Sequence, residues 1–208
     1  MNETVNLTVY QFGPISEADV VFDKYTVLIG KQGSGKSTIA KLYSMFTWLE
    51  KGLARRITSE KYITQYSRFQ KIYCAYHRLE SYFKRETVIR FYGLHYNFFY
   101  ENEKFHVEAK GLPESYKVAK VMYVPAERNF LSTADDTDGL KSLPESLETL
   151  LEEFDKAKRH SKPDIGFHSM TLILNMTHSI RYRGLKAAIT RFVCRQLPVV
   201  ISLFYLFL

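Results

Sequence analysis

The chain has little that would cross-link it or anchor it in a membrane. It contains two cysteines in 208 residues, Cys74 and Cys194, which lie far apart and form no spacing pattern. They provide no disulfide framework and suit a reducing compartment. The N-terminus carries Glu3 without an apolar run, so it does not resemble a signal peptide, and no apolar run reaches the roughly 18 residues of a transmembrane helix. We therefore expect a cytoplasmic protein without a membrane partner.

The composition is that of a globular protein with a basic surface. Hydrophobic residues make up 46% of the chain, which is sufficient for a real core, and 208 residues suit one domain or one domain with an insertion. The formal net charge of +7 permits contact with nucleic acid or an acidic membrane. Because the basic residues are spread along the chain, a solvated basic surface is the simpler interpretation.

Residues 30–37 read G-K-Q-G-S-G-K-S and fit the phosphate-binding pattern G-x-x-x-x-G-K-[ST]. Glycines allow successive backbone N–H groups to form a concave anion site. Lys36 adds a positive charge for the β- and γ-phosphates, and the Ser37 hydroxyl is a ligand for Mg²⁺. The predicted ATP-binding residues are Gly30, Lys31, Gln32, Gly33, Ser34, Gly35, Lys36, Ser37 and Thr38.

The flanking residues predict the strand and helix that such a loop requires. Residues 25–29 form an apolar, β-branched run typical of a buried strand. After the loop, apolar residues follow helical spacing up to Leu49, and Gly52 is a plausible C-cap. Two further strands are predicted upstream, at residues 7–12 and 18–22, separated by Gly13 and Pro14.

Residues 12–51, "FGPISEADVVFDKYTVLIGKQGSGKSTIAKLYSMFTWLEK", resemble the opening of the ABC-type ATPase superfamily. The resemblance is closest to the bacterial AAA-family ATPases related to SMC, RecF and OLD-type proteins, which begin with a strand, "fGpi", a second strand and a "liGxxgsGKSt" loop. It implies an α/β fold of the P-loop NTPase class, in which this chain is the N-terminal half of an ABC-type head. It also implies ATP and Mg²⁺ as cofactors, dimerisation through the heads, and DNA or a nuclease as a further partner.

Residues 53–115 are predicted to form an insertion in that head. Residues 59–83 read as a helical arm in which aromatic residues recur at steps of three and four, which favours core packing. A strand meander follows at residues 87–92, 96–100 and 104–108, with a polar turn at residues 101–103. Its aromatic residues favour cross-strand pairing over stacking on nucleobases. Cys74, His77 and Glu80 have metal-like spacings but lack the four ligands of structural zinc.

A second motif is expected where the chain returns to the core. Residues 118–124 read as a buried strand that runs into P-A-E-R-N-F-L-S, which is similar to a segment of the same ATPase group. Glu127 and Arg128 are candidate catalytic residues, since ligands of α/β sheets bind at the carboxyl ends of strands. Arg128 would contact phosphate or a partner subunit, and Glu127 would orient a water. A buried ion pair that fixes the turn is an equally good interpretation.

A helix is predicted beyond that motif. Residues 134–139 form an acidic loop whose spacing does not fit a calcium site. Ser142 and Glu145 form a capping box, and Leu147 and Leu150 belong to an amphipathic helix that follows it. We therefore divide the chain into residues 1–52 (first part of the ATPase core), 53–115 (insertion), 116–184 (continued core) and 185–208 (tail).

The tail differs from the rest of the chain. An ABC-type ATPase needs a signature segment and a Walker B strand that ends in Asp-Glu, and neither is found after residue 160. From residue 185 to residue 208 there is no acidic residue. In another reading frame, the genetic code permits a peptide with Ser-Ser-Gly and Gln-Ser-x-Leu-Pro-Leu at the spacing of the family's signature segment. Our hypothesis is that the chain leaves its ancestral frame near residue 185, which makes the tail non-native and the chain truncated.

Three functions are compatible with the sequence. The first is ATP binding by a protein of DNA-repair or phage-defence type ATPase lineage, catalytically incomplete without signature and Walker B segments. The second is a P-loop kinase acting on a small molecule. The third is a basic nucleic-acid-binding module with a vestigial P-loop, suggested by the positive charges of the predicted arm. These are Arg55, Arg56, Lys61, Arg68, Lys71, Arg78, Lys84 and Arg85.

Overall fold

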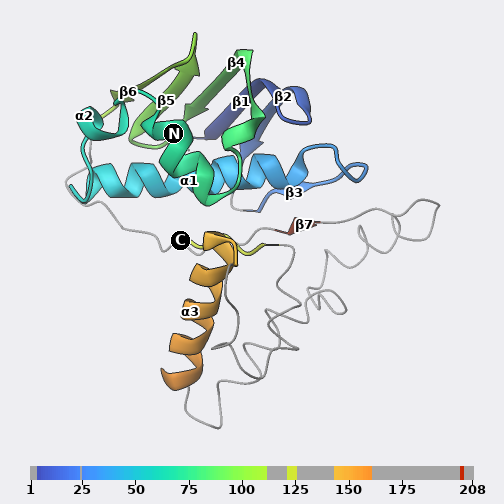
Figure 1. Cartoon of the computed structure of the whole chain (residues 1–208), viewed down its shortest axis with the longest axis vertical. Helices are drawn as coiled ribbons and strands as arrows, with labels where there is room; N and C mark the ends of the chain where they lie inside the picture. Colours follow the sequence, from blue (N-terminus) through green and yellow to red (C-terminus); the bar gives the residue numbers. More distant parts are fainter. Residues whose placement is uncertain (1–3, 24, 112–120, 126–142, 161–201, 204–208) are drawn as a thin grey trace. The chain divides into compact units, whose positions relative to one another are not determined.

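The computed structural model describes residues 4–23, 25–111, 121–125, 143–160 and 202–203 (Figure 1). They belong to two units, one of Met1–Tyr123 with Ile201–Leu208 and one of Val124–Val200. The first unit contains the predicted phosphate loop.

A five-stranded antiparallel sheet is the main element of the first unit. Its strands are β1 (Val5–Phe12), β2 (Ile15–Phe22), β4 (Phe83–Tyr92), β5 (Tyr96–Glu101) and β6 (Lys104–Ala109), in the order β2-β1-β4-β5-β6. All five predicted strands in these regions are confirmed. Because β4 pairs with β1, with Leu7 opposite Phe91 and Val9 opposite Ile89, the meander continues the sheet of the first two strands.

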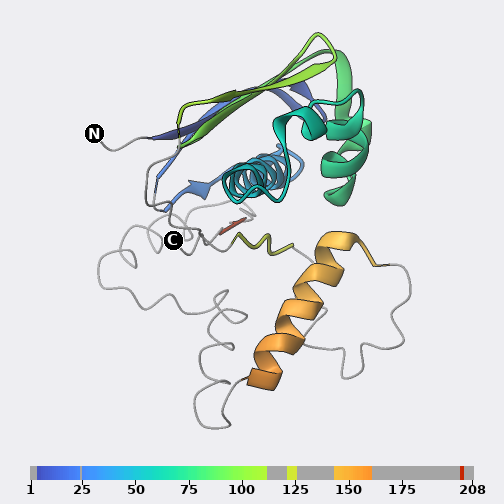
Figure 2. The same ribbon diagram turned by 90° about the vertical axis from the view of Figure 1, so that its left-hand side faces the viewer.

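Helix α1 (Lys36–Ala54) lies along one face of this sheet, as both views show (Figures 1 and 2). Successive side chains of a strand point to opposite faces of the sheet. The side chains on the inward face form the core with the buried face of α1. Phe46 of α1 is central to this core, with its ring 5.0 Å from that of Phe91 and 5.5 Å from that of Phe98. The ring of Phe98 on β5 also lies 6.1 Å from those of Phe91 on β4 and Phe105 on β6, which confirms the predicted cross-strand aromatic pairing.

The end of α1 differs from the prediction. Gly52 lies inside the helix, and Arg55 is the C-cap. The amide of Ile57 donates to the Gly52 carbonyl at 2.9 Å and that of Arg56 to the Leu53 carbonyl at 3.0 Å, which is the Schellman pattern. Arg56 takes the left-handed position with φ +57°. The Gly52 prediction is wrong because a non-glycine residue fills the position that usually selects glycine.

The predicted single helical arm is also wrong. The structure has instead α2 (Glu60–Ile63), a π-helix η1 (Phe69–Cys74) and a 3₁₀ turn η2 (Glu80–Tyr82). Left-handed residues at Ser67 and Arg78 interrupt the helix. The aromatic residues at steps of three and four therefore do not lie on one helix face. Phe69 is buried, whereas Tyr66 is 90% exposed.

Strand β3 (Val27–Leu28) precedes the phosphate loop and is shorter than predicted. It pairs antiparallel with β7 (Ser202–Leu203), a strand of the tail. Val27 and Ile29 are exposed, which contradicts the predicted buried five-residue strand. The described strands contain no parallel pair, so this part of the chain is a mixed α/β structure with antiparallel pairing.

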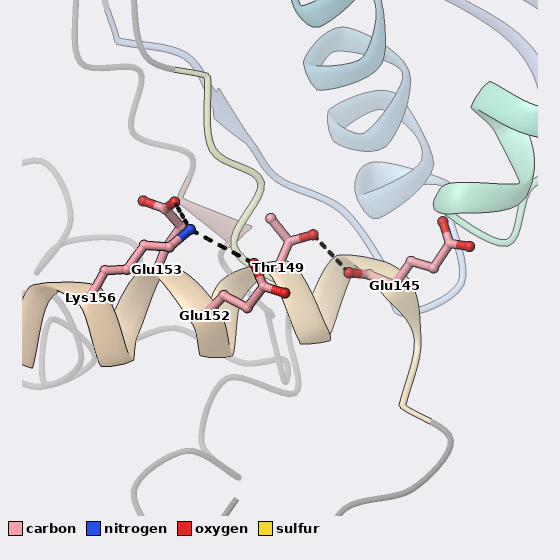
Figure 3. Close-up of polar contacts among 5 residues, drawn as sticks. All are labelled: Glu145, Thr149, Glu152, Glu153 and Lys156. Atoms are coloured by element: carbon pink, nitrogen blue, oxygen red, sulfur yellow. Dashed lines mark hydrogen bonds and ion pairs between the residues drawn. The ribbon is translucent and has the colours of Figure 1, made fainter.

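The second unit contains α3 (Glu145–His160), which confirms the predicted helix. The Pro144 carbonyl accepts from the Glu148 amide at 3.0 Å, so the helix begins two residues later than the predicted capping box requires. On its surface Lys156 pairs with Glu152 at 3.7 Å and Glu153 at 3.3 Å (Figure 3). Such pairs contribute about 0.3–0.5 kcal/mol each.

Residues 121–125 have no regular secondary structure, which contradicts the C-terminal part of the predicted strand at 118–124. The remainder of that strand, Ser142, and the candidates Glu127 and Arg128 lie outside the described residues. No helix in the described part of the chain is long and apolar enough to cross a membrane.

Candidate phosphate-binding loop

The predicted loop connects the end of β3 to the first residue of α1. Residues 31–34 and Ser37 are exposed, while Gly35 and Thr38 are buried. The site is therefore an open surface loop whose C-terminal end is fixed in the protein. The strand, loop and helix follow one another as the sequence predicts, although the strand is short.

The Lys36 ammonium folds back over the loop. Its Nζ atom donates to the Gly30 carbonyl at 2.9 Å and the Lys31 carbonyl at 2.6 Å. A third contact, to the Ser34 hydroxyl, is long at 3.4 Å. An ammonium group has three N–H donors. Two hold the loop closed on itself, and the third is weakly engaged and available to a phosphate oxygen.

Two glycines adopt conformations that other residues rarely take. Gly33 has φ +78° and open space around the position of a Cβ. Glycine is therefore favoured there by the backbone conformation alone and not by a close neighbour. Gly35 has φ +90°, and a Cβ there would clash with Cγ1 of Ile15. Glycine is thus favoured at position 35 for two reasons, its left-handed backbone and the close approach of Ile15 at the start of β2.

The N-terminus of α1 supplies further amide donors. The first intrahelical bond of this turn runs from the Ile39 amide to the Gly35 carbonyl at 2.9 Å. The amides of Lys36, Ser37 and Thr38 precede it and have no intrahelical acceptor. No acidic residue stands in the first turn of α1. Together with the helix dipole, these donors make the loop attractive to an anion.

The residues at the loop also fit a Mg²⁺ ion bound together with a nucleotide. Ser37 is exposed at the first turn of the helix and offers one hydroxyl oxygen. Mg²⁺ usually takes one or two protein ligands and completes its shell with waters and phosphate oxygens. No cluster of three acidic, His or Cys side chains that would hold a metal occurs in the described ranges.

Two polar residues that the sequence analysis did not single out connect this helix to other elements, Glu50 to the start of β5 and Lys41 to the segment between η1 and η2. Glu50 of α1 is buried, and its Oε1 accepts from the amides of His95 at 2.5 Å and Tyr96 at 3.0 Å. Burial raises the pKa of this carboxyl, and the two amides partly oppose that shift. Lys41 donates to the His77 carbonyl at 2.8 Å. The burial of Glu50 could have been predicted from the sequence, because this glutamate lies within the apolar helical stripe that contains Phe46 and Leu49.

His77 illustrates a buried group without a role in the loop. Its side chain is buried, and burial lowers the pKa of its imidazole to about 3, with Lys41 adding to that effect. The ring packs edge-on against those of Tyr76 and Tyr123. Burial also raises the pKa of the Cys74 thiol well above its usual range. At neutral pH the His77 imidazole is therefore uncharged and the Cys74 thiol remains protonated.

Comparison with protein-family models, curated proteins and solved structures finds no match for this chain. The functional argument therefore depends on the sequence and the geometry of the loop.

Proposed function

We propose that the loop at residues 30–37 binds the phosphates of ATP together with Mg²⁺. The observation that carries the proposal is the position of Lys36, whose ammonium closes over an exposed loop at the start of a helix and keeps one donor weakly engaged. The β- and γ-phosphates would accept from Lys36 and from the first amides of α1. The Ser37 hydroxyl would contribute one ligand to Mg²⁺.

A binding titration tests this proposal. Fluorescent or calorimetric titration with Mg·ATP should give saturable binding that Lys36→Ala weakens at least about tenfold, equivalent to roughly 1.4 kcal/mol. Lys51→Ala is the matched control, because Lys51 lies on the same helix in its last turn. Equal affinity in the wild type and Lys36→Ala would overturn the proposal. Titration with GTP in the same assay shows which base is preferred.

The finer assignment is also a proposal. The opening of the chain resembles an ABC-type ATPase head, and we propose that this protein descends from one and binds ATP without efficient hydrolysis. The physical reason is that no apolar run ends in the Asp-Glu pair that holds Mg²⁺ and activates water. Nucleotide binding with steady-state phosphate release close to the uncatalysed background is the expected result. Rapid turnover that Lys36→Ala abolishes would contradict it.

The proposed change of reading frame is tested on the gene itself. The nucleotide sequence from the codon of residue 164 to well beyond the stop codon is the measurement. A second frame that continues into the signature segment and an apolar strand ending in Asp-Glu would support the lineage. Frames that are closed by stop codons or encode nothing similar would contradict it and favour a compact nucleotide-binding or nucleic-acid-binding protein.

Nucleic-acid binding is a second candidate, favoured by the surface around α2. Arg55, Arg56 and Lys61 are exposed there. Tyr66 is also exposed, and the Arg68 guanidinium lies 3.9 Å from the centre of the Tyr62 ring. Basic groups beside exposed aromatic rings suit single strands. Binding that weakens steeply with salt and persists in Lys36→Ala would favour this function over ATP binding.

A further inference from the structure

The β1–β2 turn, Gly13 and Pro14, lies between the phosphate loop and the 3₁₀ turn η2. On one side, a Cβ at Gly35 would clash with Cγ1 of Ile15 and lie 3.7 Å from Cγ of Pro14. On the other side, the Gly13 amide donates to the Tyr82 carbonyl at 2.9 Å. The Tyr82 ring is so close that a Cβ at Gly13 would clash with its Cδ2. The chain is therefore closely packed at both glycines, at Gly35 by Ile15 at the start of β2 and at Gly13 by the Tyr82 ring.

An irregularity in β1 directs this turn. The register of β1 with β4 shifts between Tyr10 and Phe12, and Gln11 at the shift has φ +49°. Such a bulge bends the strand and changes the direction of the chain beyond it. Thr87 of β4 holds the bulge, because its hydroxyl donates to the Gln11 carbonyl at 2.5 Å and accepts from the Lys84 amide at 2.8 Å. The position of the turn is therefore built into the sheet.

The two ends of the phosphate loop differ in how they are held. Gly33 has open space around it, whereas Gly35 is buried against Ile15. Gly35 is also the N-cap of α1, so its position sets the direction of the next amides of the helix. We infer that the β1–β2 turn is a positioning element for the phosphate loop, coupled through Gly13 and Tyr82 to the segment that ends in η2. This inference rests on the proposed binding of ATP at the loop.

The coupling has a consequence at a distance. If the turn holds the loop in its binding conformation, then binding must in turn stabilise the contact of the turn with Tyr82, because coupling between sites is reciprocal. The Gly13 amide reports on that contact, since it exchanges with solvent only when its bond to the Tyr82 carbonyl opens. Neither Gly13 nor Tyr82 belongs to the phosphate-binding pattern.

Hydrogen exchange with and without Mg²⁺ and a non-hydrolysable ATP analogue is the decisive experiment. We expect slower exchange in peptides that cover residues 29–40, in peptides that cover 12–16 and in peptides that cover 80–84. Exchange of the β5–β6 hairpin, residues 96–109, should not change. Protection of residues 29–40 alone would overturn the coupling and leave ATP binding intact. Protection spread equally over the hairpin would overturn the coupling as well, and no protection anywhere would overturn both proposals.

Substitution of Tyr82 gives an independent test. Tyr82→Ala removes the ring that packs on Gly13 and should weaken Mg·ATP binding about three- to tenfold, while Tyr82→Phe, which keeps the ring, should restore wild-type affinity. Tyr92→Ala is the matched control, because Tyr92 lies at the opposite end of β4 and packs on Phe99. Equal affinity of folded Tyr82→Ala and the wild type would overturn the inference. If Tyr82→Ala does not fold, the exchange experiment on the wild-type chain decides.

Discussion

At the scale of single residues, Glu50 is the least expected feature of α1. Its carboxylate is buried in the core and accepts two amides from the turn between β4 and β5. Gly93 of that turn packs against it so closely that a Cβ would lie 2.8 Å from Oε1. Lys110 donates to the Gly93 carbonyl at 2.8 Å and brings a positive charge to the same place. Glu50 thereby fixes the helix to the meander.

The pH dependence of stability should reveal this buried carboxyl. Burial raises the pKa of Glu50 above its usual 4.5, so the folded state holds the proton more tightly than the unfolded state. Its contribution to stability is therefore largest below pH 4.5 and is lost as the pH rises through the folded pKa. Glu50→Gln keeps an oxygen acceptor and removes the ionisation. Denaturant unfolding from pH 4 to pH 8 should show that the free energy of unfolding of the variant increases relative to that of the wild type as the pH rises.

The difference between the two proteins isolates Glu50 from the other carboxyl groups. Glu86→Gln, an exposed change on β4, is the control and should give a nearly constant difference across the same range. A constant difference for Glu50→Gln would contradict the assignment. Glu50→Ala should be worse than Glu50→Gln at every pH, by about 1–3 kcal/mol, because it leaves two buried amides without an acceptor.

At the scale of elements, the turns carry local strain that glycine would relieve. The β5–β6 turn places Asn102 and Glu103 at φ +51° and +59°. This two-residue hairpin geometry favours Asn-Gly, and Glu103 stands where glycine is preferred. The left-handed conformation costs a residue other than glycine roughly 1–2 kcal/mol. Replacement by glycine removes this cost, but glycine loses more conformational entropy on folding, which cancels part of the gain.

Glu103→Gly should therefore stabilise the protein by about 0.5–1 kcal/mol. Thermal and denaturant unfolding would show this as a higher midpoint with an unchanged denaturant dependence. Asn102→Gly is the matched control in the same turn and should be almost neutral, since asparagine tolerates the left-handed conformation. A loss of stability in Glu103→Gly would show that the Glu103 side chain contributes more than its backbone costs.

The sequence predicts elements well where one periodicity dominates. The alternation of β1 and of the meander strands identifies them, and the stripe containing Phe46 and Leu49 identifies α1. The prediction of the helical arm is wrong because Ser67 and Arg78 adopt left-handed conformations, which serine and arginine do not indicate in a sequence. The phosphate loop is recognisable because its chemistry fixes both glycine and lysine spacing. The contact of Gly35 with Ile15 joins residues 20 apart in sequence and could not be predicted from local patterns.

At the scale of the whole molecule, apolar surface remains exposed beside the phosphate loop. Tyr25, Val27 and Ile29 are 72%, 43% and 58% exposed, and they lie in or next to β3. The apolar, β-branched run that predicts a buried strand is present, but the described partner of β3 is only the two-residue strand β7. Neighbouring apolar side chains that are exposed together favour association between chains.

This surface should make the protein self-associate through β3. Val27→Thr with Ile29→Thr keeps β-branched side chains suited to a strand and reduces the apolar surface. Light scattering and sedimentation over a range of concentrations should show less association for this double variant than for the wild type. Ile57→Thr, at an equally exposed isoleucine near the end of α1, is the control and should leave association unchanged. If the control reduces association as much as the double variant does, the effect reflects general hydrophobicity, and β3 is not the site of contact. If only the double variant reduces it while Mg·ATP affinity is retained, association and nucleotide binding are separate properties of neighbouring residues.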